Sequence, residues 1–194
     1  MLTVTCGSIV IDDIDLATLP PDIVRERLVT ISQTPLLMVG CTVRFNIDPT
    51  ESLSDTEIIT ALIRVGLWEG VLLERGGLDA EITDTLWLSR GEQQLLQLAR
   101  AMLEIQARNS RVLLIDEGTS SVDMETDARV QDLLRQDPFR SCTVLTVAHR
   151  VHTLLAYDLI VGLDQGKVVE IDEPLVLSNR KDSIFRNLLH SGGD

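Results

Sequence analysis

The strongest constraint on the fold is the apolar run Val112 to Ile115, which is followed at once by two carboxylates, Asp116 and Glu117. A second apolar segment, Cys142 to Val147, likewise lacks regular polar alternation, as is typical of parallel strands that are covered on both faces. Between the two, the apolar residues of Met124 to Arg135 recur at helical spacing, and Asp123 precedes them as a candidate N-cap. Strand, helix and strand over about 35 residues predict a βαβ unit.

The rest of the chain predicts further elements around this unit. Apolar residues at helical spacing, from Ser54 to Leu73 and from Gly91 to Gln106, predict a helical subdomain inserted into the sheet. Other predicted elements are strands at Gly7 to Ile11 and Leu28 to Ile31, a β-hairpin of Leu159 to Leu163 with Lys167 to Ile171, and a helix near Lys181 to Leu189. The predicted fold is α/β: a mostly parallel sheet core, about residues 1–35 and 108–180, with a helical subdomain at about residues 40–107.

Composition excludes several classes of protein. The 17 Lys and Arg against 30 Asp and Glu give a formal charge of −13, which argues against a surface that follows nucleic-acid phosphates or anionic lipids. No apolar run approaches the ~18 residues that a membrane-spanning helix requires. Cys6, Cys41 and Cys142 lie far apart without metal-ligand spacing, so we expect reduced cysteines in a core rather than disulfides or a zinc site.

Polar side chains follow three of the predicted strands. Asp116 and Glu117 follow one strand, His149 follows another, and Gln33 follows Leu28 to Ile31. In open α/β sheets, ligands bind beyond the carboxyl ends of the strands, so we expect these residues on one rim. Adjacent acids there suit phosphoryl transfer, in which one carboxylate holds Mg²⁺ and the other polarises water. Taken alone, the two carboxylates are as consistent with a charged turn after a core strand, and a lone His149 or Gln33 at a strand end is more typical of a polar cap.

The segment Leu88 to Gln94 begins the second helical stretch with Ser89, Arg90, Gly91 and Glu92. A Ser N-cap followed by Gly leaves free N–H groups and a hydroxyl at the positive end of a helix dipole, where anions bind. Ser89 with Glu92 three residues later also fits a capping box, which needs no ligand. We expect Ser89 to lie on a helical arm, displaced from the Gln33 rim.

The order and spacing of these segments resemble the nucleotide-binding domain of ATP-binding-cassette (ABC) transporters over nearly the whole chain, which implies a P-loop-NTPase-like core. The resemblance assigns Gln33 to the Q-loop, Ser89 to Glu92 to the signature motif, and Asp116 and Glu117 to the Mg²⁺ and general-base positions of Walker B. It also assigns Ser121 and Asp123 to the D-loop and His149 to the switch histidine. The segments Gly40 to Pro49 and Gly91 to Met102 are most similar to the second such domain of C-type, multidrug-resistance-associated transporters.

Two departures from the family pattern stand out. The P-loop pattern GxxxxGK[ST] is absent from the 194 residues, since Gly166-Lys167 is followed by Val168. In the family that loop precedes the strand at Gly7 to Ile11, so the domain is expected to be N-terminally truncated. The signature also has Glu92 where transporters usually have Gln. The added charge is unfavourable toward a phosphate but favourable toward the helix dipole, and both effects remain open.

The resemblance implies an ATPase module that couples ATP hydrolysis to export. Its cofactors are ATP and Mg²⁺, and its partners are a second nucleotide-binding domain and transmembrane domains, on the cytoplasmic face of a membrane. One alternative is a non-catalytic module that only presents the signature to another domain. A soluble ABC ATPase of DNA-repair type is disfavoured, because 56 positions separate Gln33 from Ser89 without coiled-coil heptads.

Overall fold

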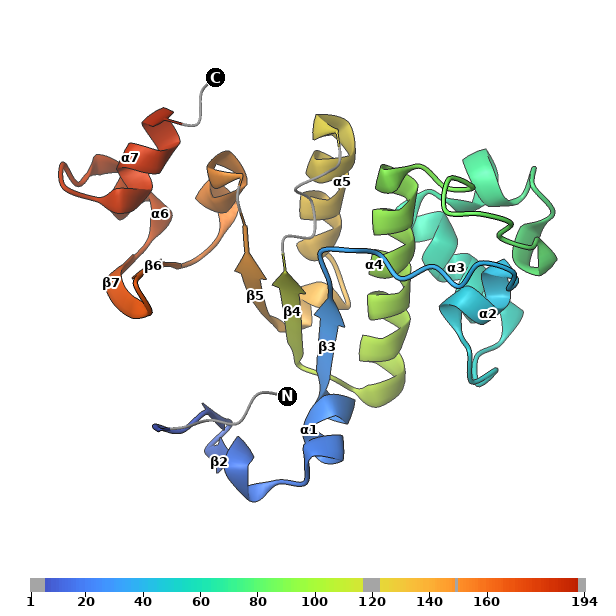
Figure 1. Ribbon diagram of the computed structural model, residues 1–194, viewed down its shortest axis with the longest axis horizontal. Helices are drawn as coiled ribbons and strands as arrows, with labels where there is room; N and C mark the ends of the chain where they lie inside the picture. The colour runs from blue at the N-terminus through green and yellow to red at the C-terminus, as the bar shows by residue number, and fades with distance from the viewer. Residues whose placement is uncertain (1–5, 117–122, 149, 192–194) are drawn as a thin grey trace. The chain divides into compact units, whose positions relative to one another are not determined.

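The computed structural model describes residues 6–116, 123–148 and 150–191 (Figure 1). The described residues fall into two compact units, which divide between Thr146 and Val147. Each unit has a hydrophobic core of its own. Glu117, Ser121 and His149, which the sequence singles out, lie outside the described residues.

The first unit is organised by a three-stranded sheet of order β3-β4-β5, made of β3 (Leu28–Ile31), β4 (Val112–Asp116) and β5 (Thr143–Val147). β3 and β4 are parallel, with Leu28 opposite Val112 and Ile31 opposite Ile115. The three arrows point the same way in Figure 1. Helix α5 (Met124–Leu134) lies between β4 and β5 in the chain, which confirms the predicted βαβ unit to within two residues at each boundary.

One face of this sheet carries the core. Val29 and Ile31 of β3 and Leu113 and Ile115 of β4 are buried, together with apolar side chains of α4 (Arg90–Arg108), the helix that packs against β3. The expectation that these strands are covered on both faces fails at β5, whereas Val112 and Leu114 on the second face of β4 are half-buried. Side chains alternate between faces, and on the second face of β5 Leu145 is 60% exposed.

The predicted helix at Ser54 to Leu73 is divided at Gly66. α3 (Asp55–Val65) ends there because Gly66 adopts a left-handed conformation, with φ of 74°, and its N–H caps the last turn. A π-helical segment, Trp68–Leu72, follows. The predicted helix at Gly91 to Gln106 is confirmed as α4, and a short helix, α2 (Val43–Ile47), was not predicted.

The predicted strand Gly7 to Ile11 is shorter than expected. Only Val10–Ile11 forms a strand, β1, which pairs antiparallel with β2 (Ile14–Asp15). Asp12 and Asp13 both have positive φ, of 49° and 63°, so they form a tight two-residue turn that ends the strand. α1 (Pro21–Arg27) then leads into β3. The three cysteines are free thiols, but Cys6 is exposed rather than in the core.

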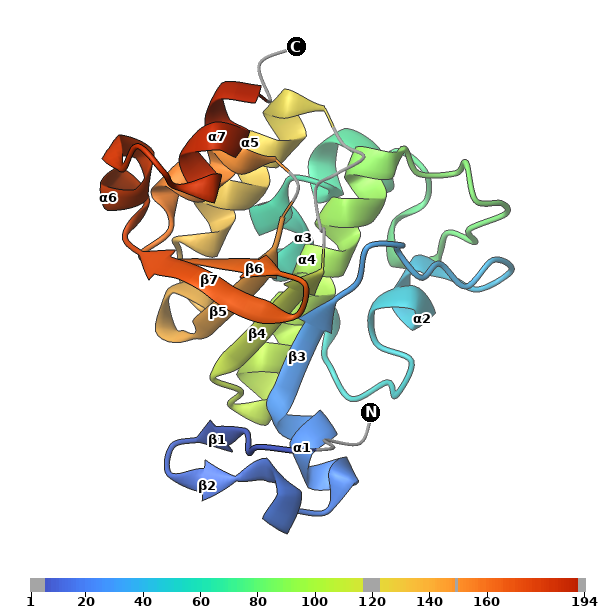
Figure 2. The ribbon, with the colours of Figure 1, turned by 60° about the vertical axis from the view of Figure 1, so that its left-hand side comes forward.

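The second unit contains the predicted hairpin, formed by β6 (Ile160–Asp164) and β7 (Lys167–Asp172) (Figure 2). α6 (Pro174–Asn179) and α7 (Ile184–Ser191) follow. α7 corresponds to the predicted terminal helix and begins three residues later than expected. Ile160, Leu177 and Phe185 form the small core. The carboxylate of Glu170 accepts the N–H of Ile184 at 3.2 Å and that of Phe185 at 2.7 Å, which supplies the cap that the start of α7 requires.

Candidate functional site

The loop after β3 and the start of α4 enclose one cavity of about 580 Å³. Gln33, Thr34 and Pro35 form one wall, and the other is formed by Thr85, Leu86, Leu88, Ser89, Arg90, Gln93 and Gln94. Ser89 lies at the start of a helix, as expected, and it lines the same cavity as Gln33. Two segments whose chemistry the sequence singled out separately face the same space.

Gln33 and Asp116 lie at the same edge of the sheet. Because Ile31 pairs with Ile115, the chains emerge together at Ser32 and Asp116, and Gln33 follows one residue later. Asp116 is exposed at the carboxyl end of β4. The predicted rim is thus confirmed for these two residues, whereas Glu117 and His149 lie outside the described residues.

Ser89 is the N-cap of α4, in a complete capping box. Its Oγ accepts the N–H of Glu92 at 3.3 Å, while Glu92 Oε2 accepts the N–H of Ser89 at 2.7 Å. The Glu92 carboxylate is thus occupied with its own helix start. Among the residues that the structure describes, the Ser89 hydroxyl proton has no acceptor, so it remains available to a ligand in the cavity.

Arg90 and Gly91 begin the helix with different surroundings. Arg90 is exposed, lines the cavity and has no ion-pair partner within the described part of the chain. Gly91 is buried against the start of α5, where an added Cβ would lie 3.0 Å from Thr126 Oγ1 and 3.3 Å from its Cγ2. A Cβ at residue 91 would be in tight contact with the Thr126 side chain, so a substitution here would require Thr126 to shift by a few tenths of an ångström.

Asp123, predicted to bind nucleotide, serves as the N-cap of α5. Its carboxylate accepts the N–H of Thr126 at 2.9 Å and its hydroxyl at 2.8 Å. These hydrogen bonds, that from the Thr126 N–H first, lower the pKa of Asp123 below its usual value. The same carboxylate reaches Gly91, since Oδ2 lies 3.6 Å from where a Cβ would stand, so Asp123 lies beside the signature segment.

Two glutamines of α4 that were not predicted also line the cavity. Gln93 Nε2 donates to the carbonyls of Thr85 at 2.8 Å and Leu88 at 2.9 Å, which fixes the chain before the helix. Gln94 is 4% exposed and forms no hydrogen bond with the described residues. The signal in the sequence is the spacing of Gly91, Gln94 and Gln97, which puts two amides on the otherwise apolar, buried face of the helix.

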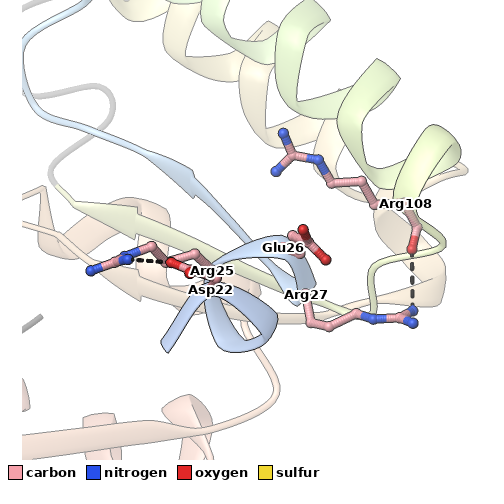
Figure 3. Close-up of a pocket in the computed structure, with 5 residues that line it drawn as sticks. All are labelled: Asp22, Arg25, Glu26, Arg27 and Arg108. Atoms are coloured by element: carbon pink, nitrogen blue, oxygen red, sulfur yellow. Dashed lines mark hydrogen bonds and ion pairs between the residues drawn. The ribbon is translucent and has the colours of Figure 1, made fainter. Parts of the chain in front are cut away.

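A second hollow, of about 750 Å³, lies between α1 and the end of α4 (Figure 3). It is lined by Asp22, Arg25, Glu26, Arg27 and Arg108. Arg25 pairs with Asp22 at 2.8 Å, and Arg27 donates to the Arg108 carbonyl at 3.4 Å. This hollow is larger than the cavity at Gln33, but its arginines already interact with other groups of the chain. None of the candidate site residues from the sequence analysis lines it.

The donor set suits a hard cation rather than zinc. Within the described ranges, no three His, Cys, Asp or Glu side chains cluster as a metal site. Two oxygen-bearing side chains, the Asp116 carboxylate and the Gln33 amide, follow the paired ends of neighbouring strands. Mg²⁺ is typically held by one or two protein oxygens with phosphates and waters completing its shell, so these residues fit it.

A parallel α/β sheet with polar residues at its strand ends, and a helix start beside them, is typical of nucleotide-binding α/β domains, of which the P-loop-NTPase-like fold is one. The chain belongs to the ABC transporter family, whose sequence pattern residues 1–120 match. It is 42% identical over 191 residues, 98% of the chain, to ABC multidrug transporter B of Aspergillus fumigatus. It is 41% identical over 186 residues, 95% of the chain, to human ATP-binding cassette sub-family C member 8.

A solved structure of a bacterial Atm1-family ABC exporter with ATP bound is similar over 98% of this chain and 33% of that chain. The TM-score is 0.85 at 27% identity. The chain spans 13% of the Aspergillus transporter and 11% of the human protein. None of the helices in the described ranges is both long and apolar enough to cross a bilayer.

Proposed function

We propose that the chain is the ATP-binding and ATP-hydrolysing module of an ABC-type exporter, which couples hydrolysis to transport across a membrane. The observation that carries the proposal is that Gln33 and Asp116 follow the paired ends of β3 and β4, while the start of α4, with Ser89, faces the loop that carries Gln33. The membership of the family and the likeness to an exporter with ATP bound support it. The module lies on the cytoplasmic face of the membrane, with transmembrane domains and a second nucleotide-binding domain as partners.

In the proposed mechanism, the rim of the sheet handles the terminal phosphate and its water. Asp116 and Gln33 would hold Mg²⁺, and the bound ion would neutralise charge on the phosphate oxygens. Glu117 accepts a proton from the attacking water. His149 donates a hydrogen bond to the terminal phosphate, and Gln33 helps to orient the water. The mechanism needs no covalent intermediate on the protein, because phosphoryl transfer depends mainly on positioning and electrostatics.

The signature residues act on a second nucleotide, held by the partner domain. The free hydroxyl proton of Ser89, the N–H groups at the start of α4 and the Arg90 guanidinium are donors for its phosphates. Gly91 lets α4 approach α5 closely, so that Asp123 lies beside this surface. The family pattern adds Ser121 as a further residue that contacts this nucleotide. Glu92 stays in its capping box, which directs its charge toward the helix N-terminus.

Within the family, we assign the chain to the second nucleotide-binding domain of a C-type transporter. The segments Gly40 to Pro49 and Gly91 to Met102 carry this assignment, and sub-family C members stand among the relatives at about 41–42% identity. The proposed subdomains are a core, about residues 1–35 and 108–180, and a helical part at about residues 40–107. The transported substrate follows from membrane domains and not from these residues.

The first test is phosphate release from Mg-ATP by the purified 194-residue chain. We expect no measurable turnover, because the sequence contains no GxxxxGK[ST] loop to hold the phosphates, and such positioning is worth ~7–11 kcal/mol. A chimaera in which a strand, a GxxxxGK[ST] loop and a helix of an active ABC ATPase precede residue 1 should hydrolyse ATP. Glu117→Gln in that chimaera should slow hydrolysis while nucleotide binding persists.

Two outcomes would contradict this proposal. One is Glu117-dependent turnover by the chain without any added loop, which would show that phosphate is held elsewhere. The other is an inactive chimaera that nonetheless stimulates a partner domain lacking its own signature. That second result would favour the non-catalytic, signature-presenting module.

A further inference from the structure

The loop that carries Gln33 runs from residue 32 to residue 42 without regular secondary structure. It is nevertheless held at defined points by side chains of α4. Gln97 Nε2 donates to the Ser32 carbonyl at 3.4 Å, and Arg100 Nη1 donates to the Leu36 carbonyl at 2.6 Å. These two contacts flank Gln33, one on each side along the chain.

Asn46 of α2 forms the second part of this clamp. It is 1% exposed, and its Oδ1 accepts both the N–H of Met38 at 2.8 Å and Nη2 of Arg100 at 3.2 Å. Its Nδ2 donates to the carbonyls of Met38 at 2.9 Å and Thr42 at 3.1 Å. One buried amide therefore joins the loop, α2 and α4.

The geometry requires a guanidinium at residue 100. Two of its nitrogens reach two different acceptors, Leu36 O and Asn46 Oδ1, while Nε is shielded from solvent. Lysine carries a single ammonium and cannot reproduce this fork. Burial lowers the pKa of Arg100, opposed by the nearby Glu104 carboxylate, as expected of a cation held in place by packing.

Arg100 and Ser89 belong to one rigid element. α4 is a continuous helix, and ten residues of α-helix separate Arg90 from Arg100, about 15 Å along its axis. Any movement of the helix is therefore transmitted to both of its ends. The loop with Gln33 is therefore hydrogen-bonded to the same helix, α4, whose first residues place Ser89 at the cavity.

We propose that Arg100, acting with Asn46, is the positioning residue that fixes the position of Gln33 relative to Ser89, so that the two residues move as one unit. Arg100 does not itself line the cavity and acts through the loop backbone. The consequence for turnover rests on the proposed ATPase function, whereas the positioning of the loop can be measured without it.

The direct test is a distance distribution between spin labels on the two walls of the cavity. Thr34→Cys and Leu86→Cys suit the labels, because Thr34 is exposed and Leu86 is 88% exposed, in a background with Cys6, Cys41 and Cys142 replaced by serine. We expect Arg100→Met to widen the distribution at least twofold and Arg100→Lys to widen it less. Arg108→Met, on the same helix but in an exposed pair with Glu104, should leave it unchanged.

An unchanged width in Arg100→Met would overturn the proposal, as would equal widening in Arg108→Met. If Arg100→Met fails to fold, hydrogen exchange of the wild-type chain decides instead. The Met38 N–H should be protected by Asn46, and exchange at the rate of an unstructured peptide would also overturn the proposal.

The second test uses the ATP-hydrolysing chimaera. Arg100→Lys should lower kcat about tenfold with the KM for ATP changed less than twofold, because a displaced Gln33 affects the reacting state more than binding. An unchanged kcat in an active chimaera would overturn the proposal. If the chimaera hydrolyses no ATP even with Arg100 intact, the proposed function fails, and the label distances alone decide the positioning role.

Discussion

Helices α3 and α4 begin with the same chemistry, but the start of α4 lines the cavity with Gln33, whereas the start of α3 does not line that cavity. Ser54 and Glu57 form a capping box at α3, as Ser89 and Glu92 do at α4. At α3 the Ser54 hydroxyl also donates to Glu57 Oε2, at 2.6 Å. At α4 the corresponding proton has no acceptor among the described residues, so the second box caps its helix and keeps a donor free.

The second difference lies at the second residue of each helix. The residue two positions after the cap is Thr56 in α3, which is exposed, and Gly91 in α4, which is buried against Thr126. A helix start that needs only stability tolerates a side chain there, whereas one that must approach another element closely does not. The comparison teaches that a capping box does not mark a ligand site until its surroundings are known.

The largest expected effect comes from making α4 begin as α3 does. Gly91→Thr would put a Cβ 3.0 Å from Thr126 Oγ1, and such overpacking typically costs about 1–3 kcal/mol of unfolding free energy. The reverse change, Thr56→Gly, should cost only ~1 kcal/mol or less, through helix propensity. Urea unfolding of both variants measures the contrast, and equal losses would show that Gly91 is not held by the contact with α5.

The two serines provide the next contrast. Ser54→Ala and Ser89→Ala should each lower the free energy of unfolding by about 1 kcal/mol, because each removes an N-cap. Only Ser89→Ala should also slow the ATP-hydrolysing chimaera, by about tenfold, since a hydrogen bond to a charged phosphate is worth ~1.5–3 kcal/mol. Equal turnover in the two variants would mean that the Ser89 hydroxyl serves stability alone.

Local patterns predicted the elements whose signals lie within a few residues. The apolar runs at Val112 and Cys142 and the cap at Asp123 gave the βαβ unit nearly to the residue. The short helices α1 and α2, of seven and five residues, were missed because helices of that length depend on tertiary packing more than on propensity.

The candidate site was predicted residue by residue but not as an arrangement. Ser89 was expected away from Gln33, because nothing local to either residue indicates the path of the loop between residues 32 and 42. That path depends on Arg100, which is 64 residues from Leu36 and 54 from Asn46 in the chain. Hydrogen-bonded residues this far apart in the chain leave no periodic signal in a single sequence. A polar residue within an apolar helical stripe, such as Arg100, is nevertheless a sign of a buried hydrogen bond.

The smallest expected effect is a pH dependence at the α3 box. Hydrogen bonds from Ser54, the side chain first and then the backbone N–H, lower the pKa of Glu57 below the ordinary 4.5. A lowered folded-state pKa contributes stability that is fully present above 4.5 and is lost as the pH falls through the folded value. The wild type should therefore have a higher free energy of unfolding than Glu57→Gln in urea at pH 7, and the difference should disappear in more acidic buffer, below the folded-state pKa.

Glu74→Gln is the matched control, since Glu74 is exposed and has no hydrogen-bond partner within the described ranges. If Glu57→Gln and Glu74→Gln behaved alike at every pH, the Glu57 carboxylate would contribute nothing through its charge, and the α3 box would rest on the serine hydroxyl.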